Sequence, residues 1–210
     1  MNTEGMATAP LSRAESKART RAKIMVAARR VFERQGFHGA SLDQVARQAG
    51  FTKGAVYSAF DSKADLFFAL LAERAAGRRA ELGSVLAEGL QGEEMVVEMS
   101  RRFARSAAAE RDWWAAVIEF ATFAARDEAL RSRYAEHHDE TREAIMRAVT
   151  AGGGAGDLDP RSVATLSMAL SSGLTLEALL SPGEVPQELY VRGQAALYRG
   201  TASATEETDR

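Results

Sequence analysis

The residues with the greatest chemical potential lie together between Ser41 and Lys63 of the 210-residue chain. Two lysines, a tyrosine and several hydroxyl side chains occur there beside a glycine. Ammonium groups, hydroxyls and helix N-termini contact phosphate oxygens, and lysine also donates to guanine in the major groove. This combination favours contacts with an anionic partner. The residues of this segment that we consider as candidates for such contacts are Ser41, Thr52, Lys53, Gly54, Ala55, Tyr57, Ser58 and Lys63.

The charge of the chain is unevenly distributed, although its formal net charge is only -2. Residues 11–63 hold eleven Lys or Arg against four Asp or Glu, a net charge of +7. The other residues hold sixteen basic and twenty-five acidic side chains, a net charge of -9. A basic segment beside an acidic remainder indicates an anionic partner for that segment. The alternative is an unevenly charged solvated surface.

The overall composition excludes several classes of protein. The chain is 46% apolar and 27% charged, as expected of a packed globular protein. It has no cysteine, which excludes disulfides and thiolate chemistry. No stretch approaches the roughly 20 uninterrupted apolar residues of a membrane helix, and the N-terminus lacks an apolar signal-peptide core. We therefore expect a cytoplasmic protein with no membrane partner.

A long helix is predicted to precede the candidate residues. Ser12 and Glu15 have the spacing of a capping box, and Gly36 is a suitable stop signal. Between them, apolar residues recur at the spacing of one buried helix face. These residues are Ile24, Ala27, Ala28, Val31 and Phe32.

Two short helices joined by a glycine turn are predicted to carry the candidate residues themselves. Ser41 caps the first, Gly50 ends it, and Thr52 caps the second. Val56 and Phe60 of the second helix face a small core. This arrangement is a helix-turn-helix, in which the N-terminal turn of the second helix enters the DNA major groove.

The remainder of the chain is also predicted to be helical, with no strand pattern. A fourth helix opens at Ser62, and further helices are expected at about 81–90, 93–109, 112–126, 127–150, 160–181 and 186–199. The glycines of residues 152–156 read as a loop, because no strand precedes them and no phosphate-binding lysine follows. The predicted fold is all-α, with a three-helix N-terminal domain and a larger helical C-terminal domain. Its expected parts are a disordered tail (1–11), a helix-turn-helix domain (12–62), a larger helical domain (63–200) and a second disordered tail (201–210).

The N-terminal part of the sequence resembles a known protein family. The run AGFTKGAVYSAFDSKADLF, after a helix ending VFERQGFHGASLDQVA, is similar to the TetR/AcrR group of bacterial transcriptional regulators. The resemblance implies a dimeric all-helical protein whose C-terminal domain dimerises and usually binds a small molecule. The stretch DWWAAVIEFATFAARDEALR is similar to the betaine-regulator-like branch. The match rests on Phe32, Gly36, Ser41, Leu42, Val45, Ala46, Gly50, Gly54, Tyr57, Phe60, Lys63 and Leu66.

The resemblance also implies roles in DNA binding. Lys53 and Ala55 take the positions that reach base edges, and Gly54 permits close approach of the backbone. Tyr57 and Lys63 take positions that grip phosphates, although a core aromatic and a surface charge are the alternatives. The hydroxyls of Ser41 and Thr52 face the DNA backbone.

Two features modify this reading. Ala55 departs from the Ser or Thr that is common there, and the small Ser58 offers little further base readout. Lys17, Arg19 and Arg21 either compensate by reaching phosphates or the minor groove, or form a solvated first turn.

The C-terminal region is predicted to hold a pocket for a small, mostly apolar molecule. Methionine and aromatic side chains repeat there at helical spacing, which is typical of a core and, in this family, of the pocket within it. Glu119 interrupts an apolar run and is either a polar group of the pocket or a surface partner of Arg126. The candidate ligand-binding residues are Met95, Met99, Phe103, Trp113, Trp114, Glu119, Phe120 and Phe123.

A dimer interface is predicted on the helix that starts at Pro160, because it is apolar on two sides and must bury both. Together with the 127–150 helix it would form a symmetric four-helix interface, the alternative being a helix fully buried within one chain. Adjacent His137 and His138 point apart on a helix, so no metal site and no cofactor are expected. The candidate interface residues are Leu130, Tyr134, His137, Leu166, Leu170, Gly173, Leu174 and Glu177.

The leading functional hypothesis is a dimeric repressor that a small-molecule effector releases from a near-palindromic operator. A DNA-binding regulator without a small-molecule ligand is the main alternative, and an activator belongs to the same class. An enzyme is not expected, because the sequence offers no paired catalytic carboxylates, nucleophile–base set or metal-ligand spacing.

Overall fold

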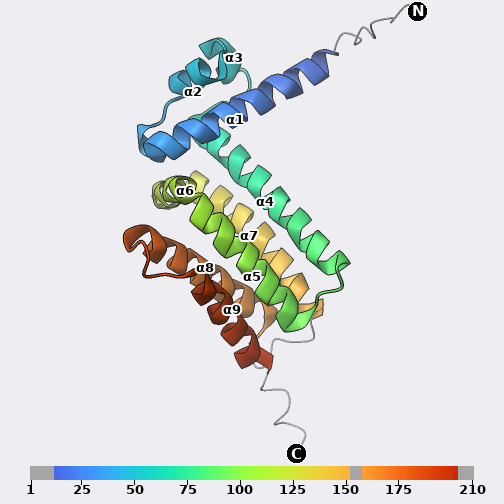
Figure 1. Ribbon diagram of the computed structural model, residues 1–210. Coiled ribbons are helices and arrows are strands. Elements are labelled where there is room, and N and C mark those ends of the chain that lie inside the picture. The colour runs from blue at the N-terminus through green and yellow to red at the C-terminus, as the bar shows by residue number, and fades with distance from the viewer. Residues whose placement is uncertain (1–11, 152–157, 203–210) are drawn as a thin grey trace, which may run out of the picture.

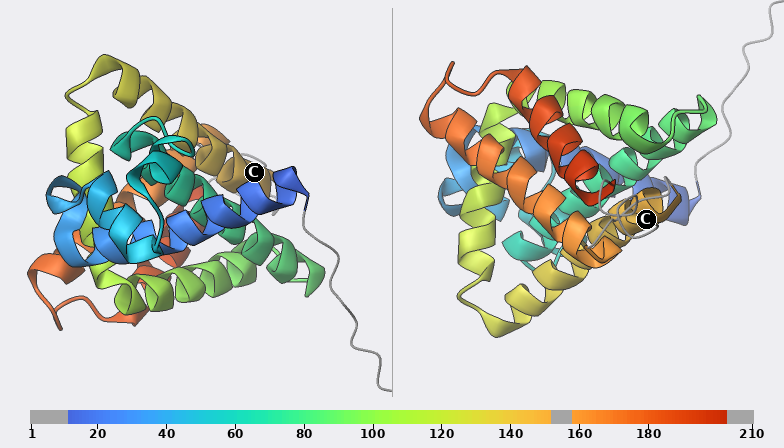
Figure 2. Two further views of the ribbon diagram at one scale, coloured as in Figure 1. Left: turned by 90° about the horizontal axis from the view of Figure 1, so that it is seen from above. Right: turned by 90° about the horizontal axis from the view of Figure 1, so that it is seen from below.

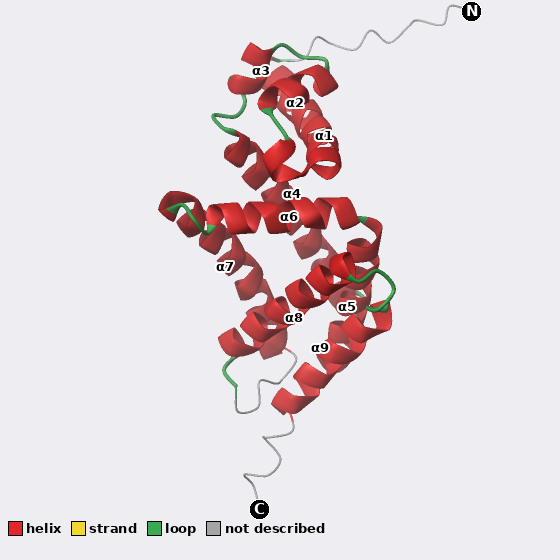
Figure 3. Cartoon of the chain, turned by 90° about the vertical axis from the view of Figure 1, so that its left-hand side faces the viewer, coloured by secondary structure: helices red, strands yellow, loops and turns green. Residues whose placement is uncertain are grey.

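The structure is a computed structural model that describes residues 12–151 and 158–202. All regular secondary structure within these ranges is helical, which confirms the predicted all-α class (Figure 3). The predicted tail 1–11, the glycine loop at 152–156 and residues 203–210 of the predicted tail 201–210 lie outside the described residues. The helices are α1 (Arg13–Gly39), α2 (Leu42–Ala49), α3 (Lys53–Tyr57), α4 (Lys63–Ala87), α5 (Gly92–Ala109), α6 (Arg111–Ala124), α7 (Glu128–Ala151), α8 (Pro160–Leu180) and α9 (Gln187–Ala202).

Several helix ends lie where the sequence signals place them. Ser12 and Glu15 form a complete capping box at the start of α1. Gly36 interrupts α1 with a left-handed φ of 69°, a conformation that glycine adopts without steric cost. Asp159 caps α8, and Pro160 occupies its first turn.

Two boundaries predicted for the C-terminal region are wrong. The helix expected at 81–90 is the second half of α4, which continues from Lys63 to Ala87, because no stop signal separates Arg79 from Glu81. The left-handed Gly89, with a φ of 81°, follows the end of this helix. Helix α9 likewise runs to Ala202, past the predicted start of the C-terminal tail.

The helices form two groups, which we call the head (α1–α3) and the body (α4–α9). Figure 1 shows α4 leading from the head down one side of the body. Helix α6 contacts α1 and lies across the body just beneath the head (Figures 1 and 3). Deeper in the body α5 pairs with α9 and α7 with α8. The end views of Figure 2 show α6 at one edge of the body, running from the α5 side to the α7 side.

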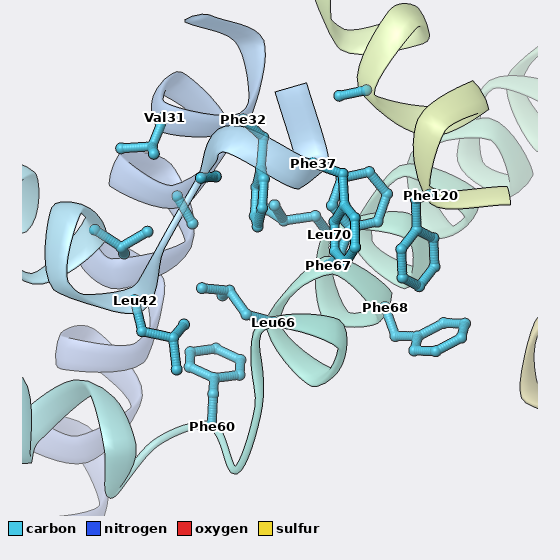
Figure 4. Close-up of a cluster of buried hydrophobic side chains, with 14 of the residues drawn as sticks. Val31, Phe32, Phe37, Leu42, Phe60, Leu66, Phe67, Phe68, Leu70 and Phe120 are labelled. Atoms are coloured by element: carbon cyan, nitrogen blue, oxygen red, sulfur yellow. The ribbon is translucent and has the colours of Figure 1, made fainter. Parts of the chain in front are cut away.

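One hydrophobic cluster joins the head to the body (Figure 4). Phe37, just after the break in α1, lies 4.8 Å from Phe120 of α6, measured between ring centroids. Phe67 of α4 lies 4.4 Å from Phe120 and stacks on Trp113 at 5.2 Å. Edge-on and offset aromatic pairs of this kind add about 0.5–1.5 kcal/mol each beyond the burial of their surface. The angle of the head on the body is therefore set by packed aromatic rings.

Helix α8 is unusual for the amount of apolar surface that it leaves exposed. It is long and apolar enough to cross a membrane by length and composition, and only 17% of its most apolar window is buried. Leu166, Leu176 and Leu180 are 45%, 40% and 69% exposed. A large exposed apolar face on a helix marks a surface that another molecule covers.

Candidate nucleic-acid interface

A tight turn fixes the angle between α2 and α3. Gly50 has a left-handed φ of 70°, and its N–H donates to the carbonyls of Ala46 and Arg47. The N–H of Phe51 also donates to the Ala46 carbonyl, at 3.0 Å. The hydroxyl of Thr52 then accepts from the Ala55 N–H at 3.2 Å and starts α3. These local hydrogen bonds satisfy end groups of both helices and hold the turn.

Helix α3 has one buried and one exposed face. Val56 is fully buried and Phe60, just beyond the helix, is 4% exposed, so these side chains anchor α3 to the head. Tyr57 is 53% exposed, which removes the core-aromatic alternative for this residue. Lys53, Gly54 and Ser58 are exposed with it. The outward face is therefore short, polar and unobstructed.

The side chain of Lys53 is already paired within the head. Its ammonium group forms an ion pair with the Asp43 carboxylate of α2, and the lysine side chain remains 66% exposed. An exposed ion pair contributes only about 0.2–1 kcal/mol. Lys53 can therefore exchange this partner for a phosphate or a base edge at small cost. No local pattern in the sequence indicates that Asp43 pairs with Lys53, because these residues are ten positions apart on different helices.

Gly54 has no structural requirement for being glycine. A Cβ atom added there would meet only the Thr52 hydroxyl, at 4.0 Å, and its φ is not left-handed. The space over this glycine is thus open on the outward face of α3. This is the geometry expected where another backbone approaches closely.

Lys17, Arg19 and Arg21, in the first part of α1, divide into two groups. Lys17 and Arg19 are exposed and remain candidates for phosphate contacts. Arg21 instead donates to the Ala59 carbonyl at 3.0 Å, and its guanidinium lies 4.1 Å from the centroid of the Phe60 ring. Arg21 therefore ties α1 to the segment after α3.

The proposed role of Lys63 in gripping phosphate needs correction. Its ammonium group donates to the carbonyls of Phe37 and Ala40 at 2.7 and 2.9 Å, and more weakly to that of His38 at 3.3 Å. Burial lowers the pKa of Lys63, and the nearby charge of Glu119 opposes this shift. Lys63 also lies over the Phe37 ring at 4.5 Å. The hydrogen bonds from the Lys63 ammonium group hold the segment from Phe37 to Ala40, where α1 ends. The role of Lys63 in the structure is therefore to stabilise the head.

Glu119 is neither a pocket residue nor a partner of Arg126. Its carboxylate accepts from the His38 N–H at 3.2 Å, across the boundary between body and head. The same carboxylate lies against Gly36, where an added Cβ would come within 2.4 Å of Glu119 Oε1. No local sequence pattern signals this contact, because the partners are 81 positions apart.

Most of the other predicted ligand-binding residues belong to packed regions. Phe120 is fully buried in the hydrophobic cluster, and Phe123 lies 5.0 Å from Phe37 at its edge. Phe103 lies 5.5 Å from the Trp114 ring. Met95 is 3% exposed, and Met99 is partly buried on the same helix. Among the described residues, these side chains pack against one another and against the core, and only Trp113 of the predicted set lines one of the two cavities described next.

One cavity in the described part of the chain is lined largely by charged side chains. It has a volume of about 250 Å³ and lies where α1, α4, α5 and α6 meet. Trp113 is the only predicted ligand-binding residue in its lining, beside Arg29, Arg74 and Arg78. A second, more open hollow of about 420 Å³ lies between the head and α7 and includes Arg21 and His137. Charged side chains make up much of the lining of both cavities, whereas the sequence predicts a mostly apolar site.

The predicted interface residues also divide into two groups. Tyr134 lies 6.0 Å from Phe120, and Leu130 packs against the same cluster, so both face the core of their own chain. Leu170 packs against α9, 3.2 Å from the position of a Cβ on Gly193. Leu174 is half-buried and His137 lines the second hollow. Leu166, Gly173 and Glu177 are exposed on α8.

Two family descriptions match this chain. The description "Bacterial regulatory proteins, tetR family" matches residues 24–70, from α1 into α4. The description "BetI-type transcriptional repressor, C-terminal" matches residues 92–197, which is just over half of the chain. The second match confirms the resemblance to the betaine-regulator-like branch.

Curated relatives match only part of this chain. The chain is 51% identical over 61 residues to the uncharacterized HTH-type transcriptional regulator TtgW of Pseudomonas putida, covering 29% of this chain and 45% of that protein. It is 34% identical over 127 residues to the HTH-type transcriptional repressor AcnR of Corynebacterium diphtheriae, covering 60% and 61%. Each match spans less than two thirds of the relative.

Solved structures share the whole fold at low sequence identity. A transcriptional regulator from Pseudomonas aeruginosa PAO1 has a TM-score of 0.74 at 20% identity and covers 94% of this chain and 97% of its own. The regulator FadR from Bacillus subtilis, solved in complex with stearoyl-CoA, has a TM-score of 0.70 at 17% identity and covers 85% and 98%. These likenesses establish the arrangement of helices alone.

Proposed function

The chain belongs to the TetR family of bacterial regulatory proteins and is a helix-turn-helix transcriptional regulator, not an enzyme. On this premise, we propose that it acts as a cytoplasmic, dimeric, ligand-responsive repressor. We assign residues 12–62 to DNA binding and residues 63–200 to dimerisation and effector binding. An effector then lowers the affinity of the dimer for its operator.

The observation that carries the DNA-binding part is the two-sided character of α3. Val56 is fully buried, whereas Tyr57, the next residue, is 53% exposed. A recognition helix needs this combination, because it must be rigid on one side and accessible to base edges on the other. Lys53, Gly54, Ala55 and Ser58 complete the proposed contact surface, together with the capping residues Ser41 and Thr52.

The observation that supports a dimer is the exposed apolar face of α8. Leu166, Ala169, Gly173 and Leu176 follow one another on it at helical spacing. Small residues among leucines allow two helices to approach closely, and a two-fold axis would place the same face of a second copy against it. Two heads would then address two half-sites one helical turn apart, about 34–36 Å, or a multiple of it.

Effector binding would act through the contacts between body and head. Arg29 of α1 donates to the Glu110 carboxylate at 2.8 Å, and Phe37 packs on α6. A ligand that favours a different arrangement of these elements changes the spacing of the heads. By thermodynamic linkage, DNA and effector then weaken each other's binding by the same factor.

Footprinting on DNA upstream of the gene for this chain tests the proposal. We expect two protected half-sites with approximate two-fold symmetry, and a single asymmetric protected site would contradict the dimeric arrangement. Adding candidate effectors should remove the protection. Protection that survives every effector would support the alternative of a regulator without a ligand, and transcription that rises with bound protein would identify an activator.

A further inference from the structure

The cavity of about 250 Å³ between head and body is lined by three arginines from two helices. Arg29 comes from α1, and Arg74 and Arg78 follow each other by one turn on α4. Glu110 pairs with Arg29 at 2.8 Å and also with Arg74. Arg78 has no ion pair of this kind among the described residues.

The buried polar atoms without a hydrogen-bond partner in the cavity lining are all donors. They are Nε of Arg74, Nη2 of Arg78 and Nε1 of Trp113, within the described part of the chain. Each buried, unsatisfied donor costs about 1–3 kcal/mol, and charged groups cost more. All three donors belong to residues that line one cavity, so an acceptor with several lone pairs bound there would satisfy them. A carboxylate or a phosphate is such an acceptor.

The charge of Arg78 is also incompletely compensated. Burial and the nearby charge of Arg74 lower the pKa of Arg78 to about 10, although Glu81 and Glu110 oppose the shift. The guanidinium lies 4.4 Å from the centroid of the Phe103 ring, which covers one of its faces. Arg78 thus lies against an aromatic surface while Nη2 stays available as a donor.

We propose that this cavity binds a small organic anion, a carboxylate or a phosphate monoester. Arg78 and Arg74 hold its charged group, and Trp113 and Leu70 contact its apolar part. The volume is below the roughly 300–1,000 Å³ of sites for drug-sized ligands, which favours a molecule with about one ring. A cation is disfavoured, because the unsatisfied groups are donors. The acidic Glu73 and Glu81 also line the cavity, and both are exposed.

The site connects directly to the head. A bound anion competes with Glu110 for Arg74, and Glu110 also holds Arg29 of α1. One carboxylate therefore links occupancy of the cavity to the position of the head. This link to DNA affinity rests on the proposed function, whereas binding of the anion does not.

Titration calorimetry of the full chain with benzoate, phenyl phosphate and inorganic phosphate tests the site, with benzamide as the neutral analogue. Emission from Trp113 and Trp114, the two tryptophans of the chain, gives a local readout. We expect saturable binding of benzoate or phenyl phosphate and a rise in Tm, with no effect of benzamide. Absence of saturable binding by both organic anions overturns the proposal, as does equal affinity for benzamide. Inorganic phosphate that binds as tightly as phenyl phosphate overturns the organic class.

Substitutions in the cavity separate a binding role from a structural one. Arg78→Gln should lower the anion affinity about tenfold or more, as expected for loss of a charge-assisted hydrogen bond. At a fixed anion concentration it should also reduce the anion-dependent rise in Tm, which would be unchanged if the role of Arg78 were purely structural. Arg78→Lys keeps the charge and should bind with intermediate affinity. Arg105→Gln, on the exposed part of α5, is the matched control and should bind as the wild type does.

Anion binding without any change in DNA affinity would retain the site and reject its role as the effector site. If the wild-type protein fails to bind DNA even when no anion is present, this result would instead contradict the proposed function. The two failures are therefore distinguishable in the same set of measurements.

Discussion

The carboxylate of Glu119 on α6 occupies the space beside Gly36 in which the side chain of any other residue would begin, with a Cβ placed 2.4 Å from Glu119 Oε1. Gly36 also has a φ of 69°, which few other residues adopt. The same carboxylate accepts from the His38 N–H. The backbone at the break in α1 thus packs closely against Glu119 of the body, and this contact orients the head.

Gly36→Ala should therefore destabilise the protein by about 1–3 kcal/mol, through backbone strain and the clash with Glu119. Chemical denaturation gives the change in the free energy of unfolding. In a double-mutant cycle with Glu119→Ala, part of this loss should be recovered, because only the steric part depends on Glu119. Strict additivity of the two substitutions would show that the contact is energetically unimportant.

Lys63→Met should destabilise the head, because it leaves the carbonyls of Phe37 and Ala40 without their donor. We expect a loss of about 1–3 kcal/mol, as for other buried groups left unsatisfied. DNA affinity, measured where the variant is still folded, should keep the wild-type dependence on salt. A shallower salt dependence, with unchanged stability, would restore Lys63 as a phosphate contact.

The stability of the body should fall in mild acid because of His137 and His138. Burial lowers the pKa of both imidazoles below their ordinary value of 6.5, so the folded state favours their neutral forms. The charge of Arg79 adds to this shift at His137 and Glu140 opposes it, whereas at His138 the charges of His137 and Arg142 add and Asp139 opposes.

The unfolded chain takes up protons first, so the free energy of unfolding is unaffected above pH 6.5 and decreases as the pH falls through the lowered pKa values. Thermal melts across this range should show the decrease. The double variant His137→Gln, His138→Gln should flatten the profile. An unchanged profile in that variant would assign the acid sensitivity to other groups.

Gly173→Arg should convert the proposed dimer into a monomer. It places a charged side chain in the centre of the exposed face of α8. Gly83→Arg on α4 is the matched control, because both glycines are exposed in helices and an added Cβ has no atom within 4 Å at either. Sedimentation should report a dimer for the wild type and the control, and a monomer for Gly173→Arg. Equal mass for the two variants would remove α8 from the interface.

Local signals in the sequence predicted most helix ends, since caps at Ser12, Ser41 and Thr52 involve residues only three positions apart. The buried side of α3, with Val56 and Phe60, could be predicted for the same reason. The ligand region could not, because Glu110, Arg29 and Arg74 meet only when α1, α4 and α6 pack together. A stripe of aromatic residues such as Phe120 and Trp113 has the same spacing whether it lines a pocket or fills a core.

The most direct test of the account compares DNA binding by the wild type, Gly54→Ala and Gly83→Ala. A methyl group at Gly54 meets open space within the protein, so both variants should fold and each gains up to about 1 kcal/mol of helix propensity. The measurement is fluorescence anisotropy with the footprinted DNA over a range of salt concentrations. We predict that affinity falls steeply with salt, that Gly54→Ala binds at least about tenfold more weakly, and that Gly83→Ala binds as the wild type does. Equal affinities for the two variants, or affinity independent of salt, would contradict the proposed interface on α3.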